Sequence, residues 1–107
     1  MNVISNNKIK CTIALAALED VLDPEIGLNV TDLGLIYQID FDEAQKTIYV
    51  TMTLTTQFCP MGESITDSVK RKFENTFHEE EVLINLTFNP PWNYERISEE
   101  GQKFLNR

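Results

Sequence analysis

The sequence predicts an α/β (α+β) domain of two layers, in the order α-β-β-α-β-α, with a three-stranded mixed sheet and two long helices on one face. Apolar residues recur at helical spacing in two segments, residues 8–22 and 60–77. They alternate with polar residues in three others, residues 35–41, 47–55 and 82–88. A short turn joins the first two strands into a hairpin, and a helix separates the second strand from the third. With 107 residues, the chain is expected to form one domain over residues 1–107.

The first predicted helix carries an apolar stripe formed by Cys11, Leu15, Leu18 and Leu22. Cys11 is therefore expected to be a small core residue rather than a reactive one. Ser5, Asn6 or Asn7 can cap the start of this helix, because their side chains accept hydrogen bonds from free N–H groups.

An ordered loop is predicted over residues 23–34. Pro24 disfavours helical geometry at Asp23, and Gly27 permits a positive φ angle. The loop carries three acids, Asp23, Glu25 and Asp32. Turn and capping chemistry is sufficient to explain acids in such a loop, so they are not by themselves evidence for catalysis.

The hairpin strands have clear predicted faces. In the first, Leu35, Tyr37, Ile39 and Phe41 alternate. In the second, Ile48, Val50, Met52 and Leu54 point one way, and Tyr49, Thr51, Thr53 and Thr55 point the other. The helices are expected to cover the apolar face and to leave the threonine face comparatively polar.

The junction between the second strand and the second long helix reads Thr55-Thr56-Gln57-Phe58-Cys59-Pro60. Proline is favoured at the first helical position, which makes Cys59 the predicted N-cap residue. Its sulfur would then face free N–H groups and the positive end of the helix dipole, a setting that favours thiolate. A carboxylate of the 23–34 loop would oppose that effect, and a buried structural cysteine at a turn is the alternative.

The C-terminal part contains the third predicted strand, the segment Asn89-Pro90-Pro91-Trp92 and a short helix capped by Ser98. Trp92 either fills the core at a chain reversal or forms part of a docking surface, and the first is the simpler interpretation.

Composition excludes several classes of protein. The net charge of −8 and the lack of a basic patch argue against nucleic-acid binding. No apolar run is long enough to span a membrane, and the N-terminus does not resemble a signal peptide, so we expect a cytoplasmic protein. Cys11, Cys59 and His78 cannot form a four-ligand zinc site in one chain.

The chemistry that remains depends on one thiol. Thr55, Thr56 and Cys59 follow the end of a strand, where ligands of α/β folds tend to bind, and Asp32 is expected at the same edge of the sheet. A soft thiolate could hold iron, a persulfide or part of an iron–sulfur cluster. Clusters usually take four cysteines, so one per chain implies a transient site, a site shared in a homodimer, or ligands from a partner.

With these residues assembled, the chain resembles the SufT/PaaD-like family of metal–sulfur (iron–sulfur) cluster biosynthesis proteins, formerly a domain-of-unknown-function family. Four motifs carry the resemblance: Asp23-Pro24-Glu25-Ile26, Asp32-Leu33-Gly34-Leu35-Ile36-Tyr37, Thr53-Leu54-Thr55-Thr56 followed by Cys59-Pro60-Met61, and Pro90-Pro91-Trp92. Phe58 and Gly101 depart from the residues common at these places, which are Gly and Ala. Phe58 would narrow access to the thiol, and Gly101 would weaken a short helix.

The resemblance implies a factor that helps to deliver iron–sulfur clusters or iron to client apo-proteins, together with the assembly machinery. It implies a functional patch that matches Asp23, Glu25, Thr55, Thr56 and Cys59, to which Asp32 is added by the Asp-Leu-Gly turn. We expect an accessory factor rather than an enzyme, with Cys59 as the transient metal or sulfur ligand. Two alternatives stay open: a thiol-dependent enzyme, and a docking module for a metal-containing oxygenase of the phenylacetate-degradation type.

Overall fold

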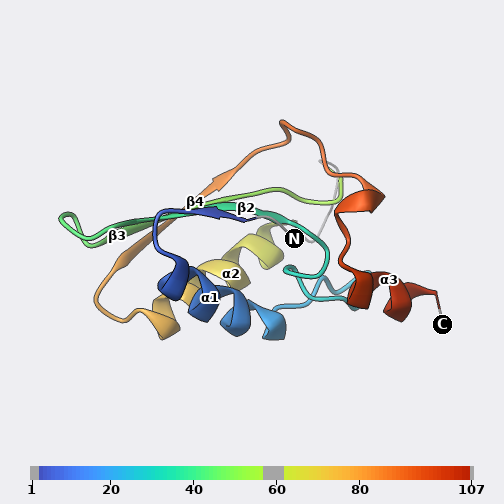
Figure 1. The fold of residues 1–107 in the computed structure, drawn as a ribbon, viewed down its shortest axis with the longest axis horizontal. Coiled ribbons are helices and arrows are strands. Elements are labelled where there is room, and N and C mark those ends of the chain that lie inside the picture. Colours follow the sequence, from blue (N-terminus) through green and yellow to red (C-terminus); the bar gives the residue numbers. More distant parts are fainter. Residues whose placement is uncertain (1–2, 57–61, 107) are drawn as a thin grey trace.

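A computed structural model describes residues 3–56 and 62–106. Along the chain its elements are β1 (Ile4–Ser5), α1 (Lys8–Ala17), the 3-10 turn η1 (Leu18–Asp20), β2 (Ile36–Asp42), β3 (Thr47–Met52), α2 (Gly62–Thr76), β4 (Glu81–Leu86), the 3-10 turn η2 (Tyr94–Arg96) and α3 (Glu99–Leu105) (Figure 1). Within these residues no helix is both long and apolar enough to cross a bilayer.

The sheet is mixed and has four strands in the order β1-β2-β3-β4. β2 and β3 form the predicted antiparallel hairpin, and β3 pairs parallel with β4 through the crossover helix α2. The prediction of three strands was wrong because it missed β1, which pairs parallel with β2. With two residues, β1 is too short to show an alternating pattern.

Asn6 extends the pairing of this short strand. Its Nδ2 donates to the carbonyl oxygen of Phe41 (3.0 Å), and its Oδ1 accepts from the N–H of Phe41 (2.9 Å). Asn7, the next residue, caps α1 by accepting from the N–H of Lys10 (3.0 Å). One of the three predicted caps is therefore correct, and its neighbour anchors the strand.

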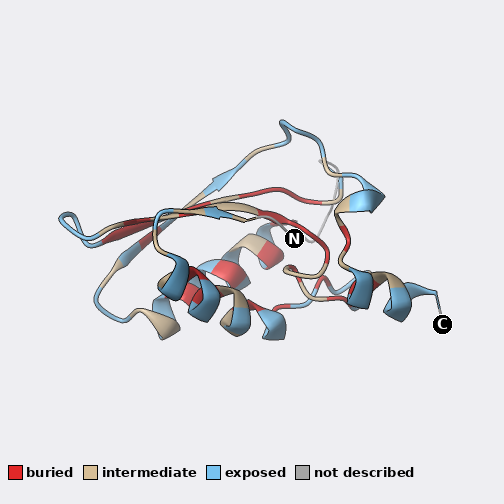
Figure 2. Cartoon of the chain, in the orientation of Figure 1, coloured by how far each residue is buried: buried red, intermediate tan, exposed pale blue. Residues whose placement is uncertain are grey.

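Both long helices cover one face of the sheet, as predicted (Figure 1). The buried residues line the space between the two layers (Figure 2). Cys11 and Ala14 of α1 and Ile65, Val69 and Phe73 of α2 belong to this core. The first helix ends earlier than predicted, however, and Leu22 is exposed rather than part of the stripe.

A bulge in β2 changes the predicted faces of this strand. Ile36 pairs with Met52 and Gln38 with Thr51, so Tyr37 is an extra residue between two paired positions. The alternation therefore shifts, and Ile36 is buried together with Ile39 and Phe41. Tyr37 was predicted on the same face as Ile39 and Phe41, and this prediction was wrong.

Beyond β3, strand periodicity stops. Thr53 was predicted on the polar face, yet it is fully buried, and its neighbour Leu54 is buried too. The Thr53 N–H donates to the carbonyl oxygen of Leu35 (2.8 Å), which holds the end of β3 against the start of β2. The regular strand ends at Met52, so the alternation of faces no longer applies and both side chains turn inward.

The C-terminal helix α3 begins at the predicted cap. The Ser98 Oγ accepts from the N–H of Gly101 (3.0 Å). Ile97 and Gly101 are buried, and Leu28 and Ile97 lie so close to Gly101 that an added Cβ would come within 2.9 Å of a side-chain carbon of each. This glycine permits close packing of α3 against the 23–34 loop.

Candidate functional site

The candidate site lies at the end of the sheet where β2 begins and β3 ends. The bond between Thr53 and Leu35 brings the end of the 23–34 loop beside the segment that follows β3. Of the two threonines predicted for the functional patch, Thr55 is half-buried and Thr56 is exposed. Cys59 and Pro60 lie outside the described residues, so the predicted N-cap thiol stays a prediction.

Asp23 accepts hydrogen bonds from backbone N–H groups in the first half of the 23–34 loop. Its carboxylate is buried, only 2% of the residue being exposed, and Oδ1 accepts from the N–H of Glu25 (2.9 Å). Its carbonyl oxygen accepts from the N–H groups of Ile26 (3.2 Å) and Gly27 (2.7 Å). Gly27 has a φ angle of +81°, as the sequence predicted for a tight turn. Asp23 therefore stabilises the loop conformation.

Glu25 differs from the other two acids of the loop. Its side chain is exposed, and no described residue forms a hydrogen bond or ion pair with its carboxylate. Among Asp23, Glu25 and Asp32, it is the acid most available to a partner or a cargo.

Asp32 connects the loop to α3. Its Oδ1 accepts from the Ser98 hydroxyl (2.8 Å), and its Oδ2 accepts from the Asn29 amide (2.8 Å). The backbone of Asp32 takes part as well, because its carbonyl oxygen accepts from the Ser98 N–H (2.8 Å). The same residue that was assigned to the functional patch thus holds the cap of the last helix in place.

The Asp-Leu-Gly turn and the Pro-Pro-Trp segment are in direct contact. The Trp92 indole N–H donates to the carbonyl oxygen of Leu33 (2.7 Å), and Tyr37 Oη donates to that of Pro90 (2.8 Å). Arg96 donates through Nε to the carbonyl oxygen of Gly34 (3.0 Å), with its guanidinium 4.2 Å from the centre of the Tyr37 ring. These contacts, together with the bonds between Asp32 and Ser98, join residues 32–37 to residues 90–98 and form the C-terminal clasp.

The clasp explains two of the four motifs structurally. Trp92 packs against the core, which agrees with the simpler of the two interpretations of its role. Gly34 has a φ angle of +75°, and an added Cβ would lie 2.8 Å from the Cβ of Arg96. Sequence reasoning did not find Arg96, because it is 62 positions from Gly34 and no spacing pattern joins them.

The acids of the loop do not gather into a metal site. Within the described ranges, no group of three or more His, Cys, Asp or Glu side chains is arranged to hold a metal ion. Asp23 and Asp32 direct their carboxylates at groups of the loop itself and of α3. Of the described residues of the predicted patch, Glu25 and Thr56 are exposed, Thr55 and Asp32 are half-buried and Asp23 is buried.

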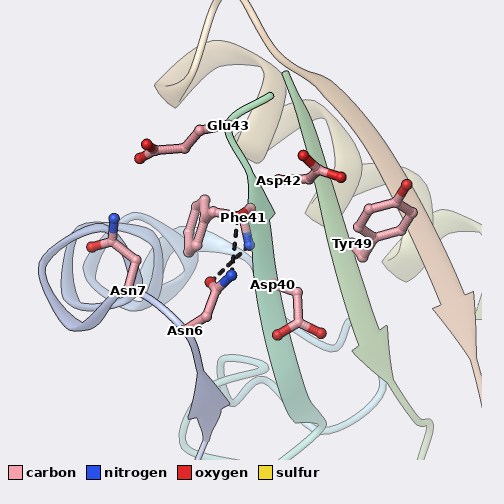
Figure 3. A pocket seen from close by; sticks show the side chains of 7 residues that line it. All are labelled: Asn6, Asn7, Asp40, Phe41, Asp42, Glu43 and Tyr49. Atoms are coloured by element: carbon pink, nitrogen blue, oxygen red, sulfur yellow. Dashed lines mark hydrogen bonds between the residues drawn. The ribbon is translucent and has the colours of Figure 1, made fainter. Parts of the chain in front are cut away.

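An open hollow of about 650 Å³ lies elsewhere, beside β2 and the start of α1 (Figure 3). Three acids line it, Asp40, Asp42 and Glu43. Asp40 accepts from the Gln38 amide (2.7 Å), and Asp42 caps the hairpin turn by accepting from the N–H of Gln45 (3.0 Å). These bonds account for the two aspartates, and none of the predicted site residues lines this hollow.

A mixed sheet with two helices on one face and a C-terminal clasp defines a small α+β domain, in which the Asp-Leu-Gly motif and Thr53 meet at one end of the sheet. Residues 13–84, more than half of the chain, match the family model described as iron-sulfur cluster assembly protein. The chain belongs to this family.

Individual relatives agree with this assignment. A Porphyromonas gingivalis protein named Fe-S protein maturation auxiliary factor is 47% identical over 84 residues, which cover 78% of this chain and 79% of the relative. A Staphylococcus aureus protein named Fe-S protein maturation auxiliary factor SufT is 36% identical over 78 residues, covering 73% and 88%. The predicted resemblance to SufT-like proteins is confirmed.

The fold is shared with a solved structure. The crystal structure of a domain of unknown function, DUF59, from Bacillus anthracis superposes with a TM-score of 0.83 at 36% sequence identity. The superposition covers 89% of this chain and 90% of that one. The α+β class predicted from the sequence is therefore correct, with the number of strands corrected from three to four.

Proposed function

We propose that this chain is an auxiliary factor in the maturation of iron–sulfur proteins, acting beside the cluster assembly machinery on client apo-proteins in the cytoplasm. Membership of the iron–sulfur cluster assembly family supports the proposal, as do the names of the Porphyromonas and Staphylococcus relatives. The role is one of holding and transfer rather than of catalysis.

The residue that we propose to hold the cargo is Cys59, and this assignment rests on the sequence alone. In the sequence it lies three residues after Thr56, and Thr53 marks the end of β3 at which the 23–34 loop meets the sheet. A thiolate is a suitable ligand for iron and a suitable carrier of sulfur. Since one cysteine is fewer than a cluster usually takes, a partner or a second copy would supply the remaining ligands, and the cargo would be held transiently.

The neighbouring residues have distinct proposed roles. Thr55 and Thr56 carry hydroxyl groups that can donate to a sulfur or an oxyanion of the cargo. Glu25 is exposed and acidic, so it can attract a cationic partner. Asp23 and Asp32 act indirectly by fixing the loop, which is what their hydrogen bonds support. The observation that carries the proposal is the contact between Thr53 and Leu35, which brings two family motifs together at one end of the sheet.

The test is Cys59→Ser in cells that lack the wild-type protein. Serine is itself a favoured cap, so the free energy of unfolding should stay within about 1 kcal/mol of the wild-type value. Serine is a far weaker ligand for soft metals, and it cannot carry a persulfide. We expect the variant to accumulate normally and yet fail to restore the activity of an iron–sulfur client enzyme.

Cys11→Ala is the matched control, because Cys11 is buried in the core on α1. At matched protein levels this variant should restore client activity while losing about 1 kcal/mol of stability. Full restoration by Cys59→Ser would show that the thiol is not needed and would overturn the mechanism.

A further inference from the structure

The two edges of the sheet are different. At one edge β1 has two residues, and the chain leaves it at once for α1. At the other edge lies β4, with six residues, whose register with β3 is regular from Glu81 to Leu86. Natural sheets usually shorten their edge strands or protect them with lysine, proline or bulges. β1 follows this rule, whereas residues 82–86 of β4 contain no charge, proline or bulge.

Half of the backbone groups of β4 point away from the sheet. The N–H groups of Glu81 and Thr87 donate to the carbonyl oxygens of Lys46 and Met52, both 2.8 Å away. In a regular parallel pair, alternate residues bond to the same neighbour, so the outward groups belong to Val82, Ile84 and Leu86. Within the described ranges these three residues form no backbone hydrogen bond outside the strand pairing.

Several side chains along this edge are both apolar and exposed. Leu83 on the open face is 43% exposed, and Leu86 on the helix face is 42% exposed. Phe88, just after the strand, is exposed as well. In a chain with a net charge of −8, residues 82–94 contain no charged residue at all. The uncharged stretch of this edge, residues 82–86, is the place where a second strand can add to this sheet.

We propose that the occupant is a second copy of this chain, paired antiparallel through β4 to give one continuous sheet across the dimer. The outward-pointing backbone N–H and C=O groups fix the register, because only Val82, Ile84 and Leu86 can exchange hydrogen bonds with the second copy. Ile84 then faces its own copy, Val82 faces Leu86, and on the open face Leu83 lies opposite Asn85. Glu81 is opposite Thr87, so no two charges meet.

Charge favours this arrangement over others. The acidic run Glu79-Glu80-Glu81 begins the strand. Antiparallel pairing places the two runs at opposite ends of a six-residue strand, about 20 Å apart at about 3.3 Å per residue. That separation exceeds the Debye length of about 8 Å at physiological salt. A parallel arrangement would set the acidic runs side by side, and a charged client strand would find no opposite charge along residues 82–88.

The pairing should be weak and reversible, because one strand pair is a small interface compared with the roughly 1,200–2,000 Å² of a stable complex. Sedimentation velocity over a concentration series should show a monomer–dimer equilibrium in about the micromolar to millimolar range. Leu86→Pro removes an outward N–H and leaves the bonds to β3 in place. It should raise the dimer dissociation constant by about tenfold or more, since the symmetry removes two bonds per dimer.

Ile9→Lys is the matched control, since Ile9 is an exposed apolar residue on α1 (76% exposed), away from the edge. It should leave the equilibrium unchanged. The register has its own test in a mixture of Leu83→Lys and Asn85→Glu chains, both altered on the exposed face. Native mass spectrometry should find the mixed dimer in excess over the two uniform dimers, because the introduced lysine of one chain would lie opposite the introduced glutamate of the other.

Three outcomes would overturn the proposal. A wild-type chain that stays monomeric up to about 1 mM would do so, as would a dimer abolished by Ile9→Lys and kept by Leu86→Pro. The third is binding of an iron–sulfur apo-protein to the monomeric wild-type chain that Leu86→Pro abolishes, since the strand that adds to β4 would then come from a client. These results are independent of Cys59→Ser, so the dimer and the proposed function can fail separately.

Discussion

Asp32 and Glu25 belong to the same loop and to the same predicted patch, yet their surroundings differ. The Asp32 carboxylate accepts two side-chain hydrogen bonds, from Ser98 and Asn29. The Glu25 carboxylate is exposed to solvent. An acidic residue in one loop can therefore serve the fold in one case and remain available for binding in the other.

This difference makes a prediction for a pair of alanine variants. Asp32→Ala should lower the free energy of unfolding by about 2 kcal/mol, because the Ser98 and Asn29 groups lose a charged acceptor. Glu25→Ala should change it by less than about 0.5 kcal/mol, as exposed substitutions usually do. Urea unfolding measures both values. Equal stabilities for the two variants would contradict the assignment of Asp32 to the fold.

Among the elements, the C-terminal clasp is the feature that joins distant parts of the chain. It connects residues 32–37 to the segment after β4 through side chains that include those of Trp92, Arg96 and Tyr37. Gly34 lies at the centre of this contact, with Arg96 against the position of its missing side chain.

Two glycine variants can separate the clasp from backbone conformation. Gly27 and Gly34 both have positive φ angles, +81° and +75°. An added Cβ at Gly27 would have no atom within 4 Å, whereas at Gly34 it would collide with Arg96. Gly27→Ala should cost about 1–2 kcal/mol for the left-handed backbone alone. Gly34→Ala should cost about 1–3 kcal/mol more because of overpacking. Thermal unfolding of both variants measures the difference. Equal losses of stability would show that Arg96 can move away from the added Cβ without lowering the free energy of unfolding.

Sequence periodicity predicted both helices, the hairpin and the crossover, because each has enough residues for a repeating pattern. It failed where the pattern is short or interrupted. β1 has two residues, the bulge at Tyr37 shifts the phase of β2, and Thr53 follows the last paired residue of β3. In all three places, contacts distant in sequence decide the structure, and periodicity carries no information about them.

The candidate site was only partly open to prediction for the same reason. That the loop and the end of β3 share one edge followed from hairpin topology, and the Thr53–Leu35 bond agrees with it. The roles of Asp23 and Asp32 did not follow, because the partner of Asp32 lies 66 positions away in Ser98. The role of Cys59 stays a prediction, since it lies outside the described residues.

Considered as a whole, the molecule extends beyond the part that matches the family model. The match ends at residue 84, but Ile97 and Gly101 are buried and Trp92 packs against the same core. Residues 13–84 therefore do not contain the complete hydrophobic core of this chain.

A chain that ends at Leu86 tests this directly. It lacks the clasp and α3, so Leu28 loses its packing against Gly101, and the carbonyl groups of Leu33 and Gly34 lose their donors. We expect a loss of more than about 5 kcal/mol, enough to unfold a typical domain of this size. Circular dichroism against a control chain ending at Leu105 provides the measurement. A truncated chain with the thermal midpoint of the control would contradict the prediction.

Trp92 is the only tryptophan of the chain, and its indole is held against the carbonyl oxygen of Leu33. Selective excitation of indole fluorescence therefore reports on one contact, the one between the C-terminal clasp and the turn that carries Asp32. Emission that shifts to longer wavelength would signal a water-exposed indole and a released clasp, even while the sheet remains folded. The protein thus carries an intrinsic optical probe next to its candidate site, which needs no label and leaves both cysteines untouched.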